Sequence, residues 1–369
     1  MKIKSISLYL AVIPLNITFS TSLGSRDTTK NIYIKLESDD GLVGWGECCP
    51  YPLINGESPE TAMVVGKMLA ENLIGADPTD LEGIMSKMDS TIYGNTSIKS
   101  AIDIACHDIK AKSLNIPLYE MLGGTLEKEL ITDYTISVAP PEVMAAKAIV
   151  AKEAGYQTLK IKLGKTGTVD VERIKAIREA IGFDVKLRVD ANQGWKIQEA
   201  ISTLTSIAPY NIQYCEEPIN RRNSFRLKKV TNNAPIKIMA DESLLDHYDA
   251  RMLIKNNQCD YFNIKLGKSS GLLKATKILK EAEEAQIDCQ IGGFLESKLV
   301  FTANCHLAHS SAQVKFYDFD SPLFMAIDPI VGGMRYKENG LIELPETAGL
   351  GLSVDEEFLA KCECIIVNS

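Results

Sequence analysis

Three acidic residues stand at the ends of three successive apolar segments of the chain. Asp190, Glu216 and Asp241 follow one another at nearly equal intervals, each closing a short run rich in Val, Ile, Leu, Tyr or Met. If these runs are neighbouring strands of one barrel, their carboxyl ends converge and the three carboxylates repel one another. A divalent cation removes this repulsion. Because all the donors are oxygens, the pattern predicts one Mg²⁺ per subunit, with Mn²⁺ as the alternative. The competing interpretation is that each acid only caps the helix that follows its strand.

Lysines end the predicted strands on either side of these acids. Lys160 and Lys162 are two positions apart, so their side chains share one face of a strand, and Lys265 closes the strand that follows Asp241. The arrangement places an amine on each side of a metal-bound substrate. A metal that holds a carboxylate stabilises the anion formed at the adjacent carbon. We expect like-charge repulsion, from Lys160 and from the metal, to lower the lysine pKa toward the working pH.

Strand and helix patterns alternate from about residue 130 onward, and they predict the element that positions these side chains. Apolar helical patterns, such as 171–181, 197–207 and 272–285, separate the candidate strands. Such repeats build either a doubly wound sheet or a (β/α)8-type barrel, and the absence of a Gly-rich nucleotide fingerprint favours the barrel. The candidate strands cover residues 135–138, 158–163, 186–190, 212–216, 236–241, 261–266, 288–291 and 314–317.

The first 124 residues predict a separate α+β domain. Strands are expected over 3–12, 31–36 and 42–46, and helical patterns occupy much of 60–122. The Ser-, Thr- and Gly-rich segment 18–30 is expected to be a mobile loop, and 50–59 a second turn-prone segment. We predict domains at 1–124 and 125–330, with 331–369 returning to pack on the first domain.

Composition excludes several classes of protein. The net charge is −8 with no basic block, which argues against nucleic-acid or anionic-membrane binding, and no uninterrupted apolar run is long enough for a membrane span. The nine cysteines contain no Cys-x-x-Cys pair, so we expect reduced thiols in a cytoplasmic protein. A signal peptide is disfavoured because the first apolar stretch alternates with period two and is broken by Pro14.

Five ordered motifs make the chain similar to the muconate-lactonizing-enzyme subgroup of the enolase superfamily. This resemblance extends over nearly the whole chain, with a further match at 118–124. It implies a modified (β/α)7β TIM barrel with an α+β N-terminal capping domain. We also expect a homo-oligomer. The motifs are Leu-Lys-Ile-Lys at 159–162, Arg-Val-Asp-Ala-Asn-Gln-Gly-Trp at 188–195, Cys-Glu-Glu-Pro at 215–218, Ala-Asp-Glu-Ser at 240–243 and Asn-Ile-Lys at 263–265.

The resemblance also implies the roles of particular residues. Lys162 and Lys265 would be acid/base catalysts on opposite faces of the substrate, with Lys160 beside Lys162. Three further polar residues would orient the ligands and lysines. The implied metal ligands are Asp190, Glu216 and Asp241, and the implied orienting residues are Asn192, Glu217 and Glu242.

The segment after the last barrel strand resembles that of the dipeptide epimerases. Asp318 and Asp320 share a face, and a small residue and Pro-Leu follow them. In those enzymes the pair binds the α-ammonium of a dipeptide, while the metal holds its carboxylate. The implied reaction is inversion of the α-carbon of the C-terminal residue. One lysine removes the proton, a metal-stabilised enediolate forms, and the other lysine returns a proton to the opposite face.

Side-chain specificity stays open at this level. Epimerases of L-alanyl-glutamate carry an arginine in the first capping loop, but Gly24 stands at that position here, and Arg26 follows two residues later. Ala-Glu specificity is therefore in question. The residues expected to contact the substrate are Asp318, Asp320, Lys160, Arg26, Ile54 and Leu295.

Three alternative functions compete with the epimerase. A cycloisomerase or an o-succinylbenzoate synthase of the same superfamily acts on substrates without an ammonium group, which leaves Asp318 and Asp320 unexplained. A Schiff-base aldolase on a similar barrel needs one lysine and no metal, so the three strand-end acids argue against it. A non-catalytic scaffold would not need Lys162, Lys265 and all three acids together.

Overall fold

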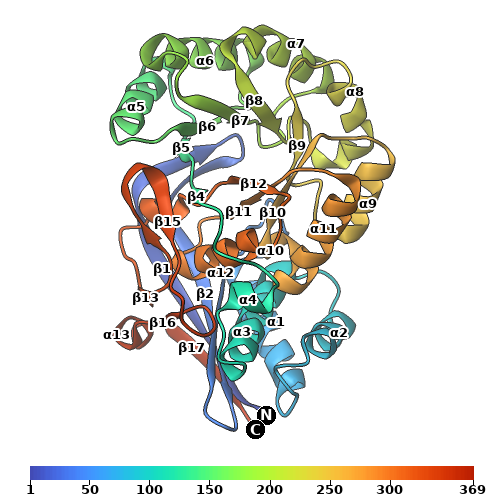
Figure 1. Cartoon of the computed structure of the whole chain (residues 1–369), viewed down its shortest axis with the longest axis vertical. Helices are drawn as coiled ribbons and strands as arrows, with labels where there is room; N and C mark the ends of the chain where they lie inside the picture. The colour runs from blue at the N-terminus through green and yellow to red at the C-terminus, as the bar shows by residue number, and fades with distance from the viewer.

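The strand–helix repeats form one curled sheet of eight parallel strands in the computed structural model, which describes residues 1–369 (Figure 1). The sheet order is β12-β11-β10-β9-β8-β7-β6-β5, so every strand neighbours the next one in the chain. This order is that of a barrel and excludes the doubly wound alternative. The strands are β5 (Tyr134–Ile136), β6 (Thr158–Lys162), β7 (Lys186–Asp190), β8 (Ile212–Glu216), β9 (Ile238–Ala240), β10 (Tyr261–Lys265), β11 (Cys289–Gly292) and β12 (Val314–Tyr317).

Seven main helices connect the eight strands and confirm the predicted (β/α)7β arrangement. The strand ladder stops between β12 and β5. There the backbone N–H of Asp133 donates to the carbonyl of Tyr317 (3.2 Å), and the N–H of Phe319 donates to Thr132 Oγ1 (2.9 Å). The helices are α5 (Pro141–Glu153), α6 (Gly167–Ile181), α7 (Ile197–Ile207), α8 (Leu227–Thr231), α9 (His247–Lys255), α11 (Leu272–Ala285), which the single turn α10 (Leu266–Ser269) precedes, and α12 (Lys298–His309).

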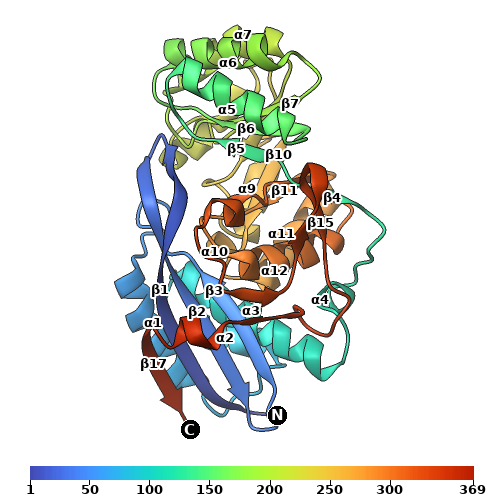
Figure 2. The same ribbon diagram turned by 90° about the vertical axis from the view of Figure 1, so that its left-hand side faces the viewer.

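A four-stranded antiparallel sheet with helices forms the capping domain (Figures 1 and 2). Its order is β17-β1-β2-β3, and β17 (Glu363–Asn368) comes from the opposite end of the chain, so the two termini lie side by side. The other elements are β1 (Ile3–Thr21), β2 (Gly24–Ser38), β3 (Val43–Cys48), α1 (Pro59–Leu73), α2 (Leu81–Thr91), α3 (Thr96–Ser113) and the short α4 (Leu118–Met121).

Short elements fill the path from the barrel back to the capping sheet. β15 pairs with both β14 and β4, and β13 pairs with β16. The domain boundaries at 124 and 330 stay a prediction. The elements are β4 (Leu130–Ile131), β13 (Ile330–Gly332), β14 (Arg335–Tyr336), β15 (Leu341–Glu343), β16 (Leu352–Val354) and α13 (Glu356–Leu359).

Local sequence explains how the capping domain closes on itself. Ser58 caps α1 in a capping box with Thr61, and Pro59 occupies the first helical position. Gly44 and Gly46 let α3 approach β3 directly, since a Cβ at either position would overlap a backbone carbonyl of that helix. A core of 22 buried apolar residues lies in this domain, and a core of 64 fills the barrel and reaches the adjoining capping residues.

The expectation of a mobile loop over 18–30 is wrong. β1 and β2 continue through this segment as one long hairpin that extends toward the barrel (Figure 2). Cross-strand side-chain hydrogen bonds support it, with Ser20 Oγ and Ser25 Oγ 2.7 Å apart, and the Ser22 hydroxyl at the tip donates to the backbone carbonyl of Asn192 (2.8 Å). The hairpin therefore brings capping-domain side chains to the mouth of the barrel.

Two further predictions concern thiols and membranes. All nine cysteines are free thiols, and Cys215, which precedes one of the strand-end acids, is fully buried in the barrel core. No helix in the structure has the combination of length and apolar character that crossing a bilayer requires.

Candidate active site

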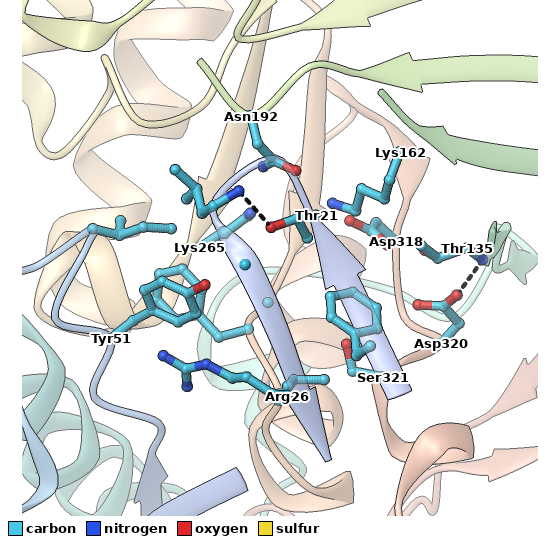
Figure 3. A pocket seen from close by; sticks show the side chains of 17 residues that line it. Thr21, Arg26, Tyr51, Thr135, Lys162, Asn192, Lys265, Asp318, Asp320 and Ser321 are labelled. Carbon is cyan, nitrogen blue, oxygen red and sulfur yellow. Dashed lines mark hydrogen bonds between the residues drawn. The ribbon is translucent and has the colours of Figure 1, made fainter. Parts of the chain in front are cut away.

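One pocket collects most of the residues that the sequence singled out (Figure 3). It lies at the carboxyl ends of the barrel strands, and residues from the β1–β2 hairpin and from the segment after β3 complete its wall. Lys162 ends β6 and Lys265 ends β10, with the three acid-bearing positions between them in the sheet, so the two amines enter from different sides. The predicted residues that line the pocket are Arg26, Ile54, Lys162, Asn192, Lys265, Leu295, Asp318 and Asp320.

The three acids predicted as metal ligands lie beneath the pocket floor. Asp190 ends β7, Glu216 ends β8 and Asp241 follows β9 directly, and none of the three is exposed. Lys162 Nζ lies 2.7 Å from Asp190 Oδ2, and Lys265 Nζ lies 2.8 Å from Asp241 Oδ2. Each candidate base is therefore in direct contact with one of the acids.

The surroundings of these acids suit a hard divalent cation. Asn192 Oδ1 and Glu242 Oε2 are buried oxygens without a hydrogen-bond partner, which is costly unless a ligand uses them. Asn192 Nδ2 donates to Glu242 Oε1 (3.5 Å), and Glu217 Oε2 accepts from the N–H of Asp241 (2.8 Å). The predicted orienting residues thus touch one another or an acid. Carboxylate and amide oxygens are the donors that Mg²⁺ and Mn²⁺ prefer.

Backbone strain is concentrated at the same strand ends. Asn192 has φ 41° and Glu217 has φ 32°, a left-handed conformation that non-glycine residues rarely adopt. The neighbouring structure must hold these turns against their intrinsic preference, as it commonly does at functional sites. Burial raises the pKa of Glu217 to about 7 despite its hydrogen bonds from Ser243 and from the Asp241 backbone.

Lys160 does not line the pocket, contrary to its predicted contact with the substrate. Its side chain is fully buried, and its ammonium contacts Asp318 (2.6 Å), Glu216 (2.8 Å) and Asp190 (3.5 Å). Burial lowers the pKa of Lys160, but these three carboxylates outweigh burial and hold the pKa well above its ordinary value. Lys160 therefore offsets the charge of acids beneath the pocket.

The pKa of Lys265 reflects the acids that surround this side chain. Burial lowers the pKa of Lys265, but the charges of Asp241 and Glu216 raise it further, so the net shift is upward. The predicted fall in lysine pKa depends on the charge of a bound metal as well as on Lys160, so it stays a prediction.

A carboxylate that the sequence did not single out joins Asp318 and Asp320. Oxygens of Asp133, Asp318 and Asp320 lie within 4.8 Å of one another, a spacing that can hold a cation. Asp133 is neutralised by Arg188 Nη1 (2.8 Å), and Asp318 by Lys160. Asp320 contacts no cation and accepts only the N–H of Thr135 (2.5 Å). The cluster therefore keeps one uncompensated carboxylate, at the pocket wall.

The pKa shifts of this cluster follow from the same contacts. Burial raises the pKa of Asp318, but Lys160, Lys162 and Lys265 outweigh it and hold the pKa below its ordinary value. Burial and the charges of Asp318 and Asp133 together hold the pKa of Asp320 well above its ordinary value. A cation bound beside Asp320 would relieve this charge crowding.

Other buried polar residues hold the acids in place and were also missed. Asn263 Nδ2 donates to Glu216 Oε1 (2.8 Å), and Gln290 Nε2 donates to Glu216 Oε2 (3.2 Å). The ammonium of Lys268 contacts Asp241 and donates to the carbonyl of Asn263 (3.0 Å). Asn263 belongs to a motif quoted above, but these residues come from strand interiors and a helix, where the strand-end pattern gives no signal.

A barrel with lysines on opposite walls, buried acids between them and a capping domain over its mouth defines a class of enzyme that works on carbon acids. Sequence matches agree with this class. Residues 6–123 match the mandelate racemase/muconate lactonizing enzyme N-terminal domain, and residues 143–358 match the enolase C-terminal domain-like family. The chain belongs to this family within the enolase superfamily.

Relatives in this family include several named epimerases. A D-Ala-D/L-Ala epimerase of Cytophaga hutchinsonii is 45% identical over 368 residues and covers 100% of both chains. A hydrophobic dipeptide epimerase of Enterococcus faecalis is 39% identical over 354 residues, covering 96% of this chain and 100% of the relative.

Solved structures of related enzymes have the same fold as this chain. A dipeptide epimerase from Cytophaga hutchinsonii, complexed with Mg and D-Ala-L-Val, superposes with a TM-score of 0.99 at 45% identity and covers 100% of both chains. An N-succinyl Arg/Lys racemase from Bacillus cereus superposes with a TM-score of 0.97 at 36% identity, again over 100% of both chains.

Proposed function

We propose that the protein is a Mg²⁺-dependent dipeptide epimerase that inverts the α-carbon of the C-terminal residue. The observation that carries this proposal is the uncompensated carboxylate of Asp320, in a pocket that also holds Lys162 and Lys265. A pocket of this kind suits a substrate with an ammonium group at one end and an acidic carbon in the middle. The named activities of the epimerase relatives support the same reading.

Asp190, Glu216 and Asp241 are the residues that would hold the metal in this proposal. When bound, the cation would stabilise the negative charge that develops on the substrate carboxylate. Asn192, Glu217 and Glu242 would orient these acids, a role consistent with their mutual hydrogen bonds and with the unpartnered oxygens beside the acids.

Lys162 and Lys265 would exchange protons with the two faces of the α-carbon. The neutral amine of one lysine takes the proton, and the electron pair of the broken C–H bond moves toward the carboxylate. The ammonium of the other lysine then donates a proton from the opposite side, which inverts the centre. Their positions on β6 and β10, separated by three strands in the sheet, support this division.

Asp318 and Asp320 would receive the α-ammonium of the dipeptide. Arg188 pairs with Asp133 and Lys160 contacts Asp318, whereas Asp320 has no cationic partner, so an ammonium group would supply the partner that Asp320 lacks. This missing partner disfavours the cycloisomerase and synthase alternatives, whose substrates carry no ammonium. It also disfavours N-succinylated amino acids, the substrates in the name of one relative.

Side-chain recognition would come from Ile54, Leu295 and Arg26. The first two give an apolar wall, and Arg26 forms no ion pair, so the edge of its guanidinium is free to meet an acidic side chain. Comparing L-Ala-L-Val with L-Ala-L-Glu in Arg26→Met separates the two contributions. Loss confined to L-Ala-L-Glu would assign Arg26 to an acidic side chain, and an equal loss on both would reject that assignment.

The decisive experiment is proton exchange in deuterated water. The protein is incubated with Mg²⁺ and a library of L,L-dipeptides, and deuterium uptake and inversion are followed by mass spectrometry and NMR. Uptake with inversion at the C-terminal residue is the expected result. Exchange of N-succinyl amino acids with none on any dipeptide would overturn the proposal and favour an acylamino-acid racemase.

A further inference from the structure

Four side chains that line the pocket contact one another in series, and three of them, Arg26, Tyr51 and Lys265, are labelled in Figure 3. The guanidinium of Arg26 lies over the ring of Tyr51, 3.9 Å from its centroid. Tyr51 stacks on Phe294 with centroids 5.9 Å apart and an interplanar angle of 25°. Lys265 Nζ lies 5.4 Å from the centroid of the Phe294 ring. The stack thus begins and ends in a cation, and its last member is a candidate catalytic lysine.

The stack spans the interface between the two domains. Arg26 comes from β2 and Tyr51 from the segment after β3, both in the capping domain, whereas Phe294 follows β11 and Lys265 ends β10 of the barrel. No sequence pattern links these positions. Their meeting depends on how the capping domain sits on the barrel.

The segment that carries Phe294 is held firmly by the capping domain. The carbonyl of Leu295 accepts from Thr29 Oγ1 and from Asn31 Nδ2, both at 3.0 Å. Glu47 accepts from the Ser297 N–H (2.9 Å) and from its hydroxyl (2.6 Å). All these groups are buried, so the Phe294 ring stands on an anchored backbone beside Lys265.

A ring in this position restricts where the ammonium of Lys265 can go. On one side the ammonium meets carboxylates, Asp241 at 2.8 Å and Glu216 at 3.9 Å. On the other side it meets the face of an aromatic ring, which attracts a cation but offers it no hydrogen-bond acceptor. No ring lies within cation–π distance of Lys162, so this restriction applies to one of the two lysines.

We propose that Phe294, supported by Tyr51 and capped by Arg26, is a positioning residue that holds Lys265 on its side of the substrate and so controls proton transfer at one face of the α-carbon. The inference rests on the proposed function, because it requires both lysines to exchange protons with the substrate. It goes further than that function because it gives the two lysines unequal surroundings. An aromatic ring restricts Lys265 at one face of the α-carbon, and no ring restricts Lys162 at the other.

The test compares exchange of the two epimers of one dipeptide in deuterated water with Mg²⁺. Lys265→Ala first identifies the epimer whose α-proton Lys265 removes, since that epimer loses exchange. We expect Phe294→Leu to slow exchange of this same epimer by roughly 3- to 30-fold, the range of a cation–π contact, and to spare exchange of the other. Phe294→Tyr, which keeps the ring, should retain the wild-type rates.

Phe19→Leu is the matched control. Phe19 lines the same pocket but packs on Phe324 (5.8 Å) and makes no cation–π contact, so its loss should affect both epimers alike. Equal slowing of both epimers in Phe294→Leu, or no slowing, would overturn the positioning role even while the wild type exchanges both. Absence of exchange of either epimer by the wild-type protein would instead reject the proposed function itself.

Discussion

Replacing Asp320 with asparagine removes the one uncompensated charge in the pocket while nearly conserving shape. The side chain is 1% exposed, and its carboxylate accepts the N–H of Thr135, a contact that the amide oxygen of asparagine can keep. The neighbouring carboxylates of Asp133 and Asp318 are already offset by Arg188 and Lys160. Asp320→Asn therefore removes the one carboxylate of the cluster that has no cationic partner.

The size of the effect follows from the burial of this charge. Losing one partner of a buried charge pair costs about 2–5 kcal/mol. Because asparagine can still accept a hydrogen bond and Asp318 remains nearby, we expect the lower part of this range, about 2–3 kcal/mol. The value of kcat/KM for a dipeptide should fall by roughly 30- to 150-fold.

The assay compares a free dipeptide with its N-acetylated form, in the wild-type protein and in Asp320→Asn. The variant should lose activity on the free dipeptide and none on the acetylated one, while binding Mg²⁺ as before. A pH series adds a second readout. The raised pKa of Asp320 means that its carboxylate gains a proton as the pH falls, so the wild-type KM for the dipeptide should rise on the acidic side. Asp320→Asn should lack this rise. An equal loss on both substrates would refute the reasoning.

Three other predictions follow from the buried polar groups. Glu242→Gln should weaken Mg²⁺ binding by roughly 10- to 100-fold, measured by calorimetry with the metal alone, and unchanged binding would exclude Glu242 from the metal site. Asp133→Asn should lower the free energy of unfolding by roughly 3–5 kcal/mol because Arg188 is left without its carboxylate partner. Adding Arg188→Met should recover most of the lost stability. A double variant less stable than Asp133→Asn alone would contradict this prediction. Burial lowers the pKa of His306 to about 3 from 6.5, so the unfolded chain binds a proton that the folded one rejects. Stability should thus fall by up to about 1.4 kcal/mol per pH unit below pH 6.5, and denaturation of His306→Asn should show a shallower decline.

The barrel could be predicted from sequence because its determinants are local. Each strand has an apolar run, four of the runs (β6, β7, β8 and β10) end in a charged residue, and the repeat length indicates which ends meet. Three strands, β7, β8 and β12, have the bounds that the pattern indicated, and the acids and lysines lie together beside one pocket. The family resemblance rested on the same local motifs.

The rest depended on tertiary packing. The hairpin through residues 18–30 has the composition of a loop, and cross-strand pairs together with docking on the barrel hold it extended. Asp133 precedes its strand rather than following it, so a rule about strand ends could not find it. The stack from Arg26 to Lys265 joins four separate segments, and only the domain interface brings them together.

The pairing of β17 with β1 sets an order for folding. Ser5 faces Asn368 in this ladder, so two neighbouring strands are separated by nearly the whole chain. Closing so long a loop is entropically costly and slow unless the intervening residues are already compact. During synthesis the barrel can form first, while the outer edge of β1 stays unpaired until residues 363–368 have been made. The fourth strand of the capping sheet is therefore added only after the barrel residues have been made, which makes closure of this sheet a late step of folding.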